Sequence, residues 1–377
     1  MKKFLMMSAA VVAVCSVSCS KIEDLSKEQA ISFAVASYVP QTKAESIRSV
    51  DGVNAFTCKA FLHANGAAQG SDYFGTSGET IQFNNSTATW APVTHPYYWP
   101  KHPASYINFV SWYDNGAGPS GTVTETSMAW TQRTIGPADN IMFADEAWRY
   151  TSNDNAVYKK DGVTAGVPTL FHHALAKVKI QFNASPLTDP ADANVSFEVK
   201  LQTVQLQSVY TQGSMSLTNS DNGSMGQKAW TPANSTYFWD TYGGTSNFDL
   251  VTSDTGLNDN SFTTVFPTAA TQTSAGITAQ SVLPQAVTNG MKLVITYAVT
   301  IKYKAGTANE ETILAEQDIP ATVQLNTLMN SSSVAITQWL PNKIYTYSIT
   351  INPLTDQILI DPAVENWTTE NVSATIE

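Results

Sequence analysis

Apolar and polar residues alternate with a period of two along several segments of the chain, which is the pattern of half-buried β-strands. The clearest case is Lys292–Tyr303, in which every second residue from Leu293 onward is large and apolar. The same alternation occurs in Lys177–Phe182, Leu201–Val209 and Tyr345–Ile351. No window of helical length carries a convincing apolar stripe with the helical period. The pattern therefore predicts an all-β protein.

The strands are expected to form two domains. Turn-forming clusters such as Asp114–Gly116 separate many short strands, which is typical of antiparallel sandwiches. The alternation pauses at Asp161–Pro168 before a new run begins at Leu170. We place the boundary there, so that residues 30–168 form an N-terminal β-sandwich and residues 169–377 form a C-terminal one.

The first residues have the features of an export signal. Lys2 and Lys3 precede Phe4–Val17, a stretch of apolar and small residues that is too short to span a bilayer. A stretch of this kind that ends in small residues is typical of a secretory signal peptide. We therefore expect the protein to be exported.

The end of this segment, Ser16–Cys19, resembles the lipobox of bacterial lipoproteins, in which small residues precede a cysteine that becomes the lipidated N-terminus. Ser16 departs from the pattern, because an aliphatic residue is usual there. The resemblance implies a signal peptide of residues 1–18, lipidation at Cys19 and a polar tether over residues 19–29. An ordinary secreted protein is the alternative. Cleavage before Cys19 would leave Cys58 without a disulfide partner, and we expect Cys58 to be a small buried hydrophobe.

Charge is sparse and its balance is acidic. The chain of 377 residues has 20 Lys and Arg against 31 Asp and Glu, a formal net charge of −11, and charged residues make up only 14% of it. A hydrophobic content of 43% argues against disorder, which requires low hydrophobicity and high net charge. An acidic chain also lacks the basic surface that nucleic-acid phosphates require, so no nucleic-acid partner is expected.

Motifs that would carry chemistry are weak. Gly116–Gly121 matches the spacing of a dinucleotide-binding loop, but β-favouring residues follow it instead of a helix, and we interpret it as a turn. His172 and His173 are adjacent on a predicted strand and would point to opposite faces, so they could not readily share a metal ion. The loops Asn219–Gly223 and Asp254–Asn260 could hold Ca²⁺ through oxygen ligands, although plain turns are favoured. We expect no cofactor, no metal and no catalytic site.

Aromatic residues cluster in the first half of the chain. They could stack on sugar rings in a glycan-binding site, or they could fill the core of a sandwich, where the polar atoms of Tyr and Trp suit half-buried positions. Core packing is favoured. The residues are Trp90, Tyr97, Tyr98, Trp99, Tyr106, Trp112 and Tyr113.

Several segments resemble the fimbrillin family, the subunits of type V pili in Bacteroidales. The strongest match is Trp339–Ile351, which continues through Ile358 to a near-terminal Trp367. A second is Leu170–Val178, which is similar to the strand that opens the family's second domain. Weaker matches occur, in the family's order, at Tyr98–Pro100, Tyr106–Phe109, Asn140–Ala144 and Val282–Gln285.

The resemblance implies two tandem transthyretin-like Greek-key β-sandwich domains and assembly into a filament. In this family a lipidated precursor reaches the surface of the outer membrane, and a protease then cuts just after the first strand. A neighbouring subunit's C-terminal segment fills the resulting groove by donor-strand exchange. The implied partners are other fimbrial subunits, joined head to tail, and the implied role is a fimbrial subunit that contributes to adhesion.

Carried over to this sequence, the resemblance assigns the first-strand plug to Ile31, Phe33 and Val35. It favours Arg48 over Lys43 as the cleaved residue, although Arg48 could equally be an ordinary surface arginine. The donor segment would be Gln357–Glu377, which could instead be the last native strand of the subunit. The donor candidates are Ile358, Ile360, Val364 and Trp367.

A second hypothesis is a monomeric surface lipoprotein that stays anchored through Cys19 and binds glycans or proteins. The sequence leaves open whether a fimbrial subunit of this kind would form the shaft, the tip or the anchor.

Overall fold

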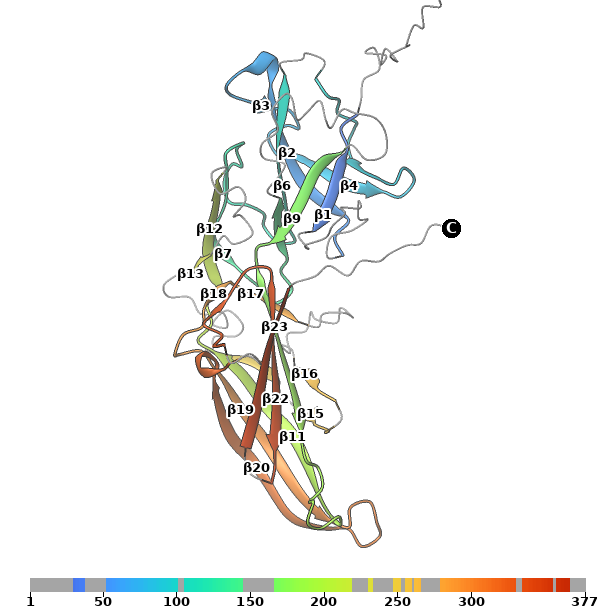
Figure 1. Ribbon diagram of the computed structural model, residues 1–377, viewed down its shortest axis with the longest axis vertical. Helices are drawn as coiled ribbons and strands as arrows, with labels where there is room; N and C mark the ends of the chain where they lie inside the picture. Colours follow the sequence, from blue (N-terminus) through green and yellow to red (C-terminus); the bar gives the residue numbers. More distant parts are fainter. Residues whose placement is uncertain are drawn as a thin grey trace, which may run out of the picture.

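The computed structural model is built almost entirely from β-strands, and the prediction of an all-β protein is confirmed (Figure 1). The part of the chain that the structure describes contains no α-helix, only short 3-10 turns at Ala64–Gly66 and Leu325–Thr327. Within that part, no helix has the length and apolar character needed to cross a bilayer. The structure describes residues 30–37, 52–100, 105–144, 166–218, 230–232, 247–251, 255–259, 261–265, 279–329, 334–354 and 357–366.

The N-terminal strands form one sheet whose pairings close into a ring. Neighbouring strands follow the order β2, β4, β5, β1, β9, β8 and β6, and β6 pairs with β2 to complete the circle, while β3 adds to one end of β2. Alternate residues of each strand face inward, so the ring encloses an apolar core that includes Phe56, Trp90 and Phe109. The strands are β1 Phe33–Ser37, β2 Ala55–His63, β3 Ser71–Asp72, β4 Glu79–Asn84, β5 Thr89–Pro92, β6 Tyr106–Asp114, β8 Ile141–Ala144 and β9 Val167–His173.

The C-terminal strands form two sheets that pack face to face around a second core. One sheet has the order β16, β10, β22, β23, with β17 also paired to β10, and the other has the order β14, β11, β19, β20, with β15 also paired to β11. The predicted strand Lys292–Tyr303 is β19, and its residues Leu293, Ile295 and Tyr297 are buried in this core. The other strands are β10 Ala176–Ala184, β11 Val195–Gln207, β14 Asn247–Val251, β15 Thr255–Gly256, β16 Thr263–Val265, β17 Gln280–Val282, β20 Glu311–Gln324, β22 Lys343–Asn352 and β23 Gln357–Asn366.

A third, smaller sheet joins the two halves of the chain. Strand β7 (Ser127–Thr134) pairs with β12 (Gln212–Thr218), which pairs with β13 (Thr231–Pro232). Trp130 and Trp230 lie in the apolar cluster beneath this sheet, together with residues on the outer face of the ring. Strand β18 (Gln285–Ala286) pairs with β21 (Gln338–Trp339).

The boundary proposed near Pro168 stays a prediction. Strand β9, which contains Pro168, pairs with β1 and β8 in the N-terminal ring, and the next strand, β10, belongs to a C-terminal sheet. The pairing of β7 with β12 connects residues on both sides of the proposed boundary.

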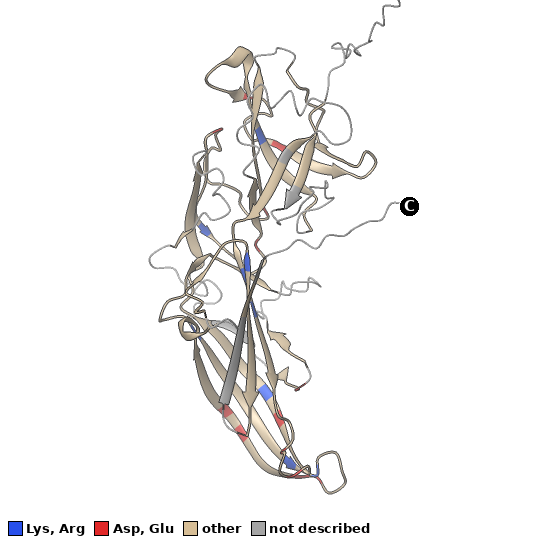
Figure 2. Cartoon of the chain, viewed as in Figure 1, with Lys and Arg blue, Asp and Glu red and all other residues tan. Residues whose placement is uncertain are grey.

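Charged side chains are spread thinly over the strands, as Figure 2 shows, and one cluster of them is buried. The Asp114 side chain, at the end of β6, has no exposed surface and accepts hydrogen bonds from Arg133 Nη2 at 3.0 Å and Trp130 Nε1 at 3.0 Å. Arg133 Nη2 also lies 3.1 Å from a carboxylate oxygen of Asp139. This cluster ties the end of β6 to β7 and to the loop that follows it.

The fold is expected to lose stability as the pH falls below 6.5, because His173 is buried in a neutral form. Burial, with the charges of Lys177 and His172, lowers the pKa of His173 well below its ordinary value of 6.5. The unfolded chain therefore takes up a proton near pH 6.5 while the folded chain does not. Protonation of His173 has no effect on the free energy of unfolding above that pH, and it lowers this free energy below it. The expected loss is about 1.4 kcal/mol for each pH unit between 6.5 and the lowered pKa.

This prediction can be checked by urea unfolding of the wild type and of His173→Gln at pH 7.5 and pH 5.5. The variant should lose less stability on acidification than the wild type does. A matched control is His95→Gln, because the His95 side chain is exposed in the folded protein. Equal losses in the wild type and His173→Gln would contradict the assignment.

Candidate functional site

The first strand and the residues just before it supply three buried side chains to the core of the ring. Ile31, Phe33 and Val35 are 1%, 3% and 1% exposed, because they occupy alternate positions that face inward. The phenyl group of Phe33 packs edge-on against those of Phe56 and Phe109, with centroid separations of 5.8 and 5.6 Å. The predicted plug residues therefore lie together in the core.

Strand β1 is an interior strand of the ring, with a partner on each side. It runs antiparallel to β5, with Phe33 opposite Trp90, and parallel to β9 over five residue pairs. The flanking backbone continues the bonding, since Ile31 N donates to the Tyr97 carbonyl oxygen at 2.8 Å and Val167 N donates to the Ser32 carbonyl oxygen at 2.8 Å. Its backbone is therefore held from both sides.

A glycine allows β9 to approach β1 closely. At Gly166, a Cβ atom would lie 2.6 Å from the backbone carbon of Phe33 and 2.6 Å from the backbone nitrogen of Ala34. No side chain fits between the two backbones at this point, so the residue must be glycine. The one signal of this role in the sequence is that Gly166 stands directly before an extended apolar run.

Removal of β1 would change the ring in two ways. It would leave β5 and β9 with unpaired backbone edges, which are templates for another extended strand. It would also uncover the inward face that Ile31, Phe33 and Val35 fill. Burial of each of these side chains contributes roughly 1.5–3 kcal/mol relative to exposure. Without β1 the ring would have unpaired backbone edges beside an uncovered apolar face, and an extended segment with apolar residues at alternate positions would match both.

The C-terminal segment forms strand β23 at the edge of a C-terminal sheet. It pairs antiparallel with β22 over ten residue pairs, and β22 pairs parallel with β10 on its other side. The register places Ile358 and Ile360 opposite Ile351 and Ile349, whose side chains are fully buried. The structure therefore has this segment as a native strand, and its alternating apolar positions are the property that a donor strand requires.

The remaining predicted site residues divide into described and undescribed ones. Val364, near the end of β23, is 39% exposed. Cys58 is fully buried as predicted, in the same core as the plug, and burial raises the pKa of its thiol to about 12. Cys19, Arg48 and Trp367 lie outside the described residues, as does the loop Asn219–Gly223.

The aromatic cluster is mostly structural. Trp90 and Trp99 are 1% and 6% exposed in the ring core, and Trp112 is 8% exposed on the outer face of the same sheet. The tyrosines are half-buried, which fits the predicted core packing. His172 and His173 are both buried on β9, and His172 stacks on Phe143 with ring centroids 5.9 Å apart. No three His, Cys, Asp or Glu side chains among the described residues are grouped closely enough to hold a metal ion.

Comparison with known proteins identifies relatives by sequence and by fold. A family model described as fimbrillin-like matches residues 42–367. A fimbrial protein from Bacteroides vulgatus is 15% identical, with a TM-score of 0.55 over 90% of this chain and 99% of that protein. A candidate cell adhesion protein from Bacteroides uniformis is 16% identical, with a TM-score of 0.47 over 90% and 99%. The match to the Bacteroides vulgatus protein establishes a shared fold. No curated protein matches this chain.

Proposed function

Because the chain belongs to the fimbrillin-like family, we propose that it is a structural subunit of a cell-surface fimbrium that contributes to adhesion and has no enzymatic activity. The family model spans residues 42–367, which include the other strands of the ring and both C-terminal sheets but begin after β1. The observation that carries the proposal is the position of β1, an interior strand near the start of the described residues whose apolar side chains fill the ring core.

Assembly proceeds by exchange of one strand for another. Proteolysis after Arg48 releases the segment that contains β1 and opens the ring between β5 and β9. A strand from a neighbouring subunit then restores the backbone hydrogen bonds and covers the core again. Because a closed ring buries the apolar face that an open one exposes, subunits stay monomeric until they are cut.

The donor strand comes from the C-terminal segment of the neighbour. Ile358, Ile360, Val364 and Trp367 supply the apolar plugs in place of Ile31, Phe33 and Val35. β23 is at a sheet edge and Val364 is exposed, so it can leave its sheet with the loss of one strand pairing. Donor and receptor lie on different parts of the subunit, so each contact is head to tail and repeats without closing.

Export as a lipoprotein brings the subunit to the surface before it is cut. Acylation at Cys19 anchors the precursor in the outer membrane, since each buried methylene contributes about 0.8 kcal/mol. The polar segment after Cys19 spaces the ring from the membrane. Cleavage after Arg48 removes the anchor and β1 together, which couples release from the membrane to activation for assembly.

The test is the mature N-terminus of the protein taken from intact cells, determined by mass spectrometry. We expect a start at Ser49 in the assembled fraction, together with ladders of bands that resist SDS. Arg48→Ala should keep the lipidated Cys19 and abolish the ladders. Lys43→Ala should instead start at Ser49 and form ladders as the wild type does. A lipidated Cys19 on every wild-type molecule would contradict assembly by cleavage and would favour a permanently anchored binding protein.

A second measurement reports the opening of the ring directly. In the chain from residue 20 onward, Cys58 is the sole thiol and lies in the same core as the β1 plug. Its reaction with a thiol reagent should be slow in the intact chain and fast after cleavage, until an added synthetic peptide of residues 357–377 slows it again. A rate that cleavage leaves unchanged would mean that β1 stays in place.

A further inference from the structure

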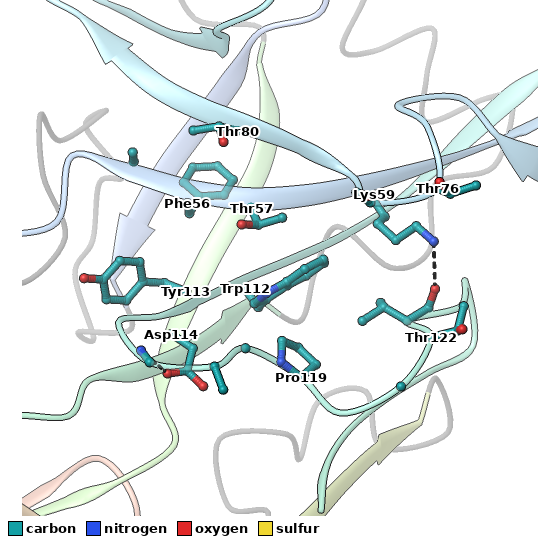
Figure 3. A pocket seen from close by; sticks show the side chains of 17 residues that line it. Phe56, Thr57, Lys59, Thr76, Thr80, Trp112, Tyr113, Asp114, Pro119 and Thr122 are labelled. Carbon is teal, nitrogen blue, oxygen red and sulfur yellow. Dashed lines mark hydrogen bonds between the residues drawn. The ribbon is translucent and has the colours of Figure 1, made fainter. Parts of the chain in front are cut away.

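An open pocket of about 650 Å³ lies on the ring beside strands β2, β4 and β6 (Figure 3). Its other wall is the loop of residues 116–123, which joins β6 to β7 and includes the glycine-rich segment Gly116–Gly121. A volume of this size is in the range typical of small-molecule sites, about 300–1,000 Å³. Among the lining residues are Phe56, Thr57, Lys59, Thr80, Trp112 and Pro119.

The indole of Trp112 forms a central part of the wall. Trp112 lies opposite Thr57 in the pairing of β6 with β2, and Figure 3 shows its side chain between β2 and the loop at Pro119. The residue is only 8% exposed, yet its indole N–H donates no hydrogen bond to any described residue. The indole nitrogen is not one of the fully buried atoms that lack a partner, so its N–H is accessible from the pocket and available to a ligand there.

The loop that forms the opposite wall is held in position by its own hydrogen bonds. Gly116 N donates to Asp114 Oδ1 at 2.7 Å, and Ser120 N donates to the Ala129 carbonyl oxygen at 2.7 Å. At the far end, Lys59 Nζ donates to the Val123 carbonyl oxygen at 3.1 Å (Figure 3). The loop wall of the pocket is therefore held in place by hydrogen bonds within the chain, and binding would cost little loop ordering.

The charged groups of the pocket are already compensated. Lys59 Nζ lies 3.3 Å from Asp72, and the Asp114 carboxylate is paired with Arg133 at 3.0 Å. Neither an anionic nor a cationic ligand would find an unpaired opposite charge. What remains is an aromatic wall, one free indole donor and hydroxyls such as those of Thr57 and Thr80, which make no hydrogen bond to described residues.

We propose that this pocket binds a neutral saccharide. The apolar C–H face of a pyranose ring packs on an aromatic surface, and its hydroxyl groups donate to and accept from threonine hydroxyls, backbone groups and an indole N–H. Trp112 belongs to the apolar cluster on the outer face of the ring, whereas the β1 plug lies in the inner core. The site is therefore separate from the assembly groove and does not depend on strand exchange.

The test measures saccharide binding to the purified chain from residue 20 onward by saturation-transfer NMR and isothermal titration calorimetry. The probes are neutral disaccharides of glucose, galactose, mannose and N-acetylglucosamine, with sialyllactose and glucuronic acid as charged comparisons. We expect at least one neutral probe to bind. Trp112→Phe keeps an aromatic wall but removes the N–H, and it should weaken binding about ten-fold; Thr57→Val should act in the same direction.

Matched controls separate binding from folding. Trp99→Phe changes an equally buried tryptophan outside the pocket and should leave the affinity of the saccharide unchanged. The melting temperatures of all variants show whether each has folded. The proposal is overturned if no neutral probe binds the wild type, if the charged probes bind more tightly, or if folded Trp112→Phe and Thr57→Val bind as the wild type does. Because uncleaved monomer is used, failure here leaves the proposal of strand exchange intact.

Discussion

Phe33→Ala is expected to lower the free energy of unfolding by about 3–5 kcal/mol, the range for large-to-small substitutions of an aromatic residue in a core. Phe33 is 3% exposed and packs against Phe56 and Phe109, so truncation leaves a cavity in the middle of the ring. Because the Phe33 side chain packs β1 against the core, its truncation should also make β1 easier to detach. Urea unfolding measures the first effect, and the reaction rate of the Cys58 thiol measures the second.

The control for this substitution is the residue directly before Phe33. Ser32 is half-buried at a position that alternates with the plug residues, and its backbone carbonyl, not its side chain, accepts the hydrogen bond from Val167. Ser32→Ala should therefore change stability by less than about 1 kcal/mol. If Phe33→Ala and Ser32→Ala have similar effects on unfolding and on thiol reactivity, the plug is not what keeps β1 in place.

Asp114→Ala is expected to cost a similar amount, about 3–5 kcal/mol, for a different reason. The carboxylate has no exposed surface and accepts hydrogen bonds from Arg133, Trp130 and the backbone of Gly116. Removal of the acceptor leaves a largely buried guanidinium and a buried indole N–H without this partner. Urea unfolding should report the loss, and tryptophan emission should shift as water reaches Trp130.

Comparison with an exposed ion pair provides the control for Asp114. Glu198 lies 2.9 Å from Lys200 with both side chains 41% exposed, so Glu198→Ala should change stability by less than about 1 kcal/mol. Asp114→Asn, which keeps an acceptor oxygen but loses the charge, should fall between the two. A small effect of Asp114→Ala would mean that Arg133 finds sufficient compensation from Asp139.

The strands that could be predicted from the sequence are those buried on one face. Lys292–Tyr303 alternates because one side packs in the C-terminal core, and its predicted limits coincide with β19. The alternation of Ile31, Phe33 and Val35 with smaller residues has the same cause, because their side chains face the core of the ring. By contrast, Glu311–Gln324 is exposed over most of its length, and only Ile319, Ala321 and Val323 at its end alternate and pack on the core. The exposed part forms a strand because β19 supplies the backbone partners. Pairing of this kind leaves no signal in local sequence.

Local sequence patterns also could not predict the part of the site that depends on contacts between residues far apart in the chain. The β1 plug was predicted from the family resemblance, but the parallel pairing of β1 with β9 joins Phe33 to Val167, far along the chain. The closure of the ring by β6 and β2 depends in the same way on long-range contacts. Likewise Gly116–Gly121, interpreted as a turn, gains its role as a pocket wall because β2 and β4 lie across from it.

The direction of the long C-terminal strands determines how the molecule would respond to a mechanical pull. Strands β11, β19, β22 and β23 run along the long axis of the molecule (Figure 1). Backbone hydrogen bonds are roughly perpendicular to antiparallel strands, so tension along that axis would load the ten pairs between β22 and β23 in shear. Bonds loaded in shear must break together, whereas a peeling force would break them one by one. The C-terminal half should therefore resist extension strongly while its edge strand can still be peeled away from the side.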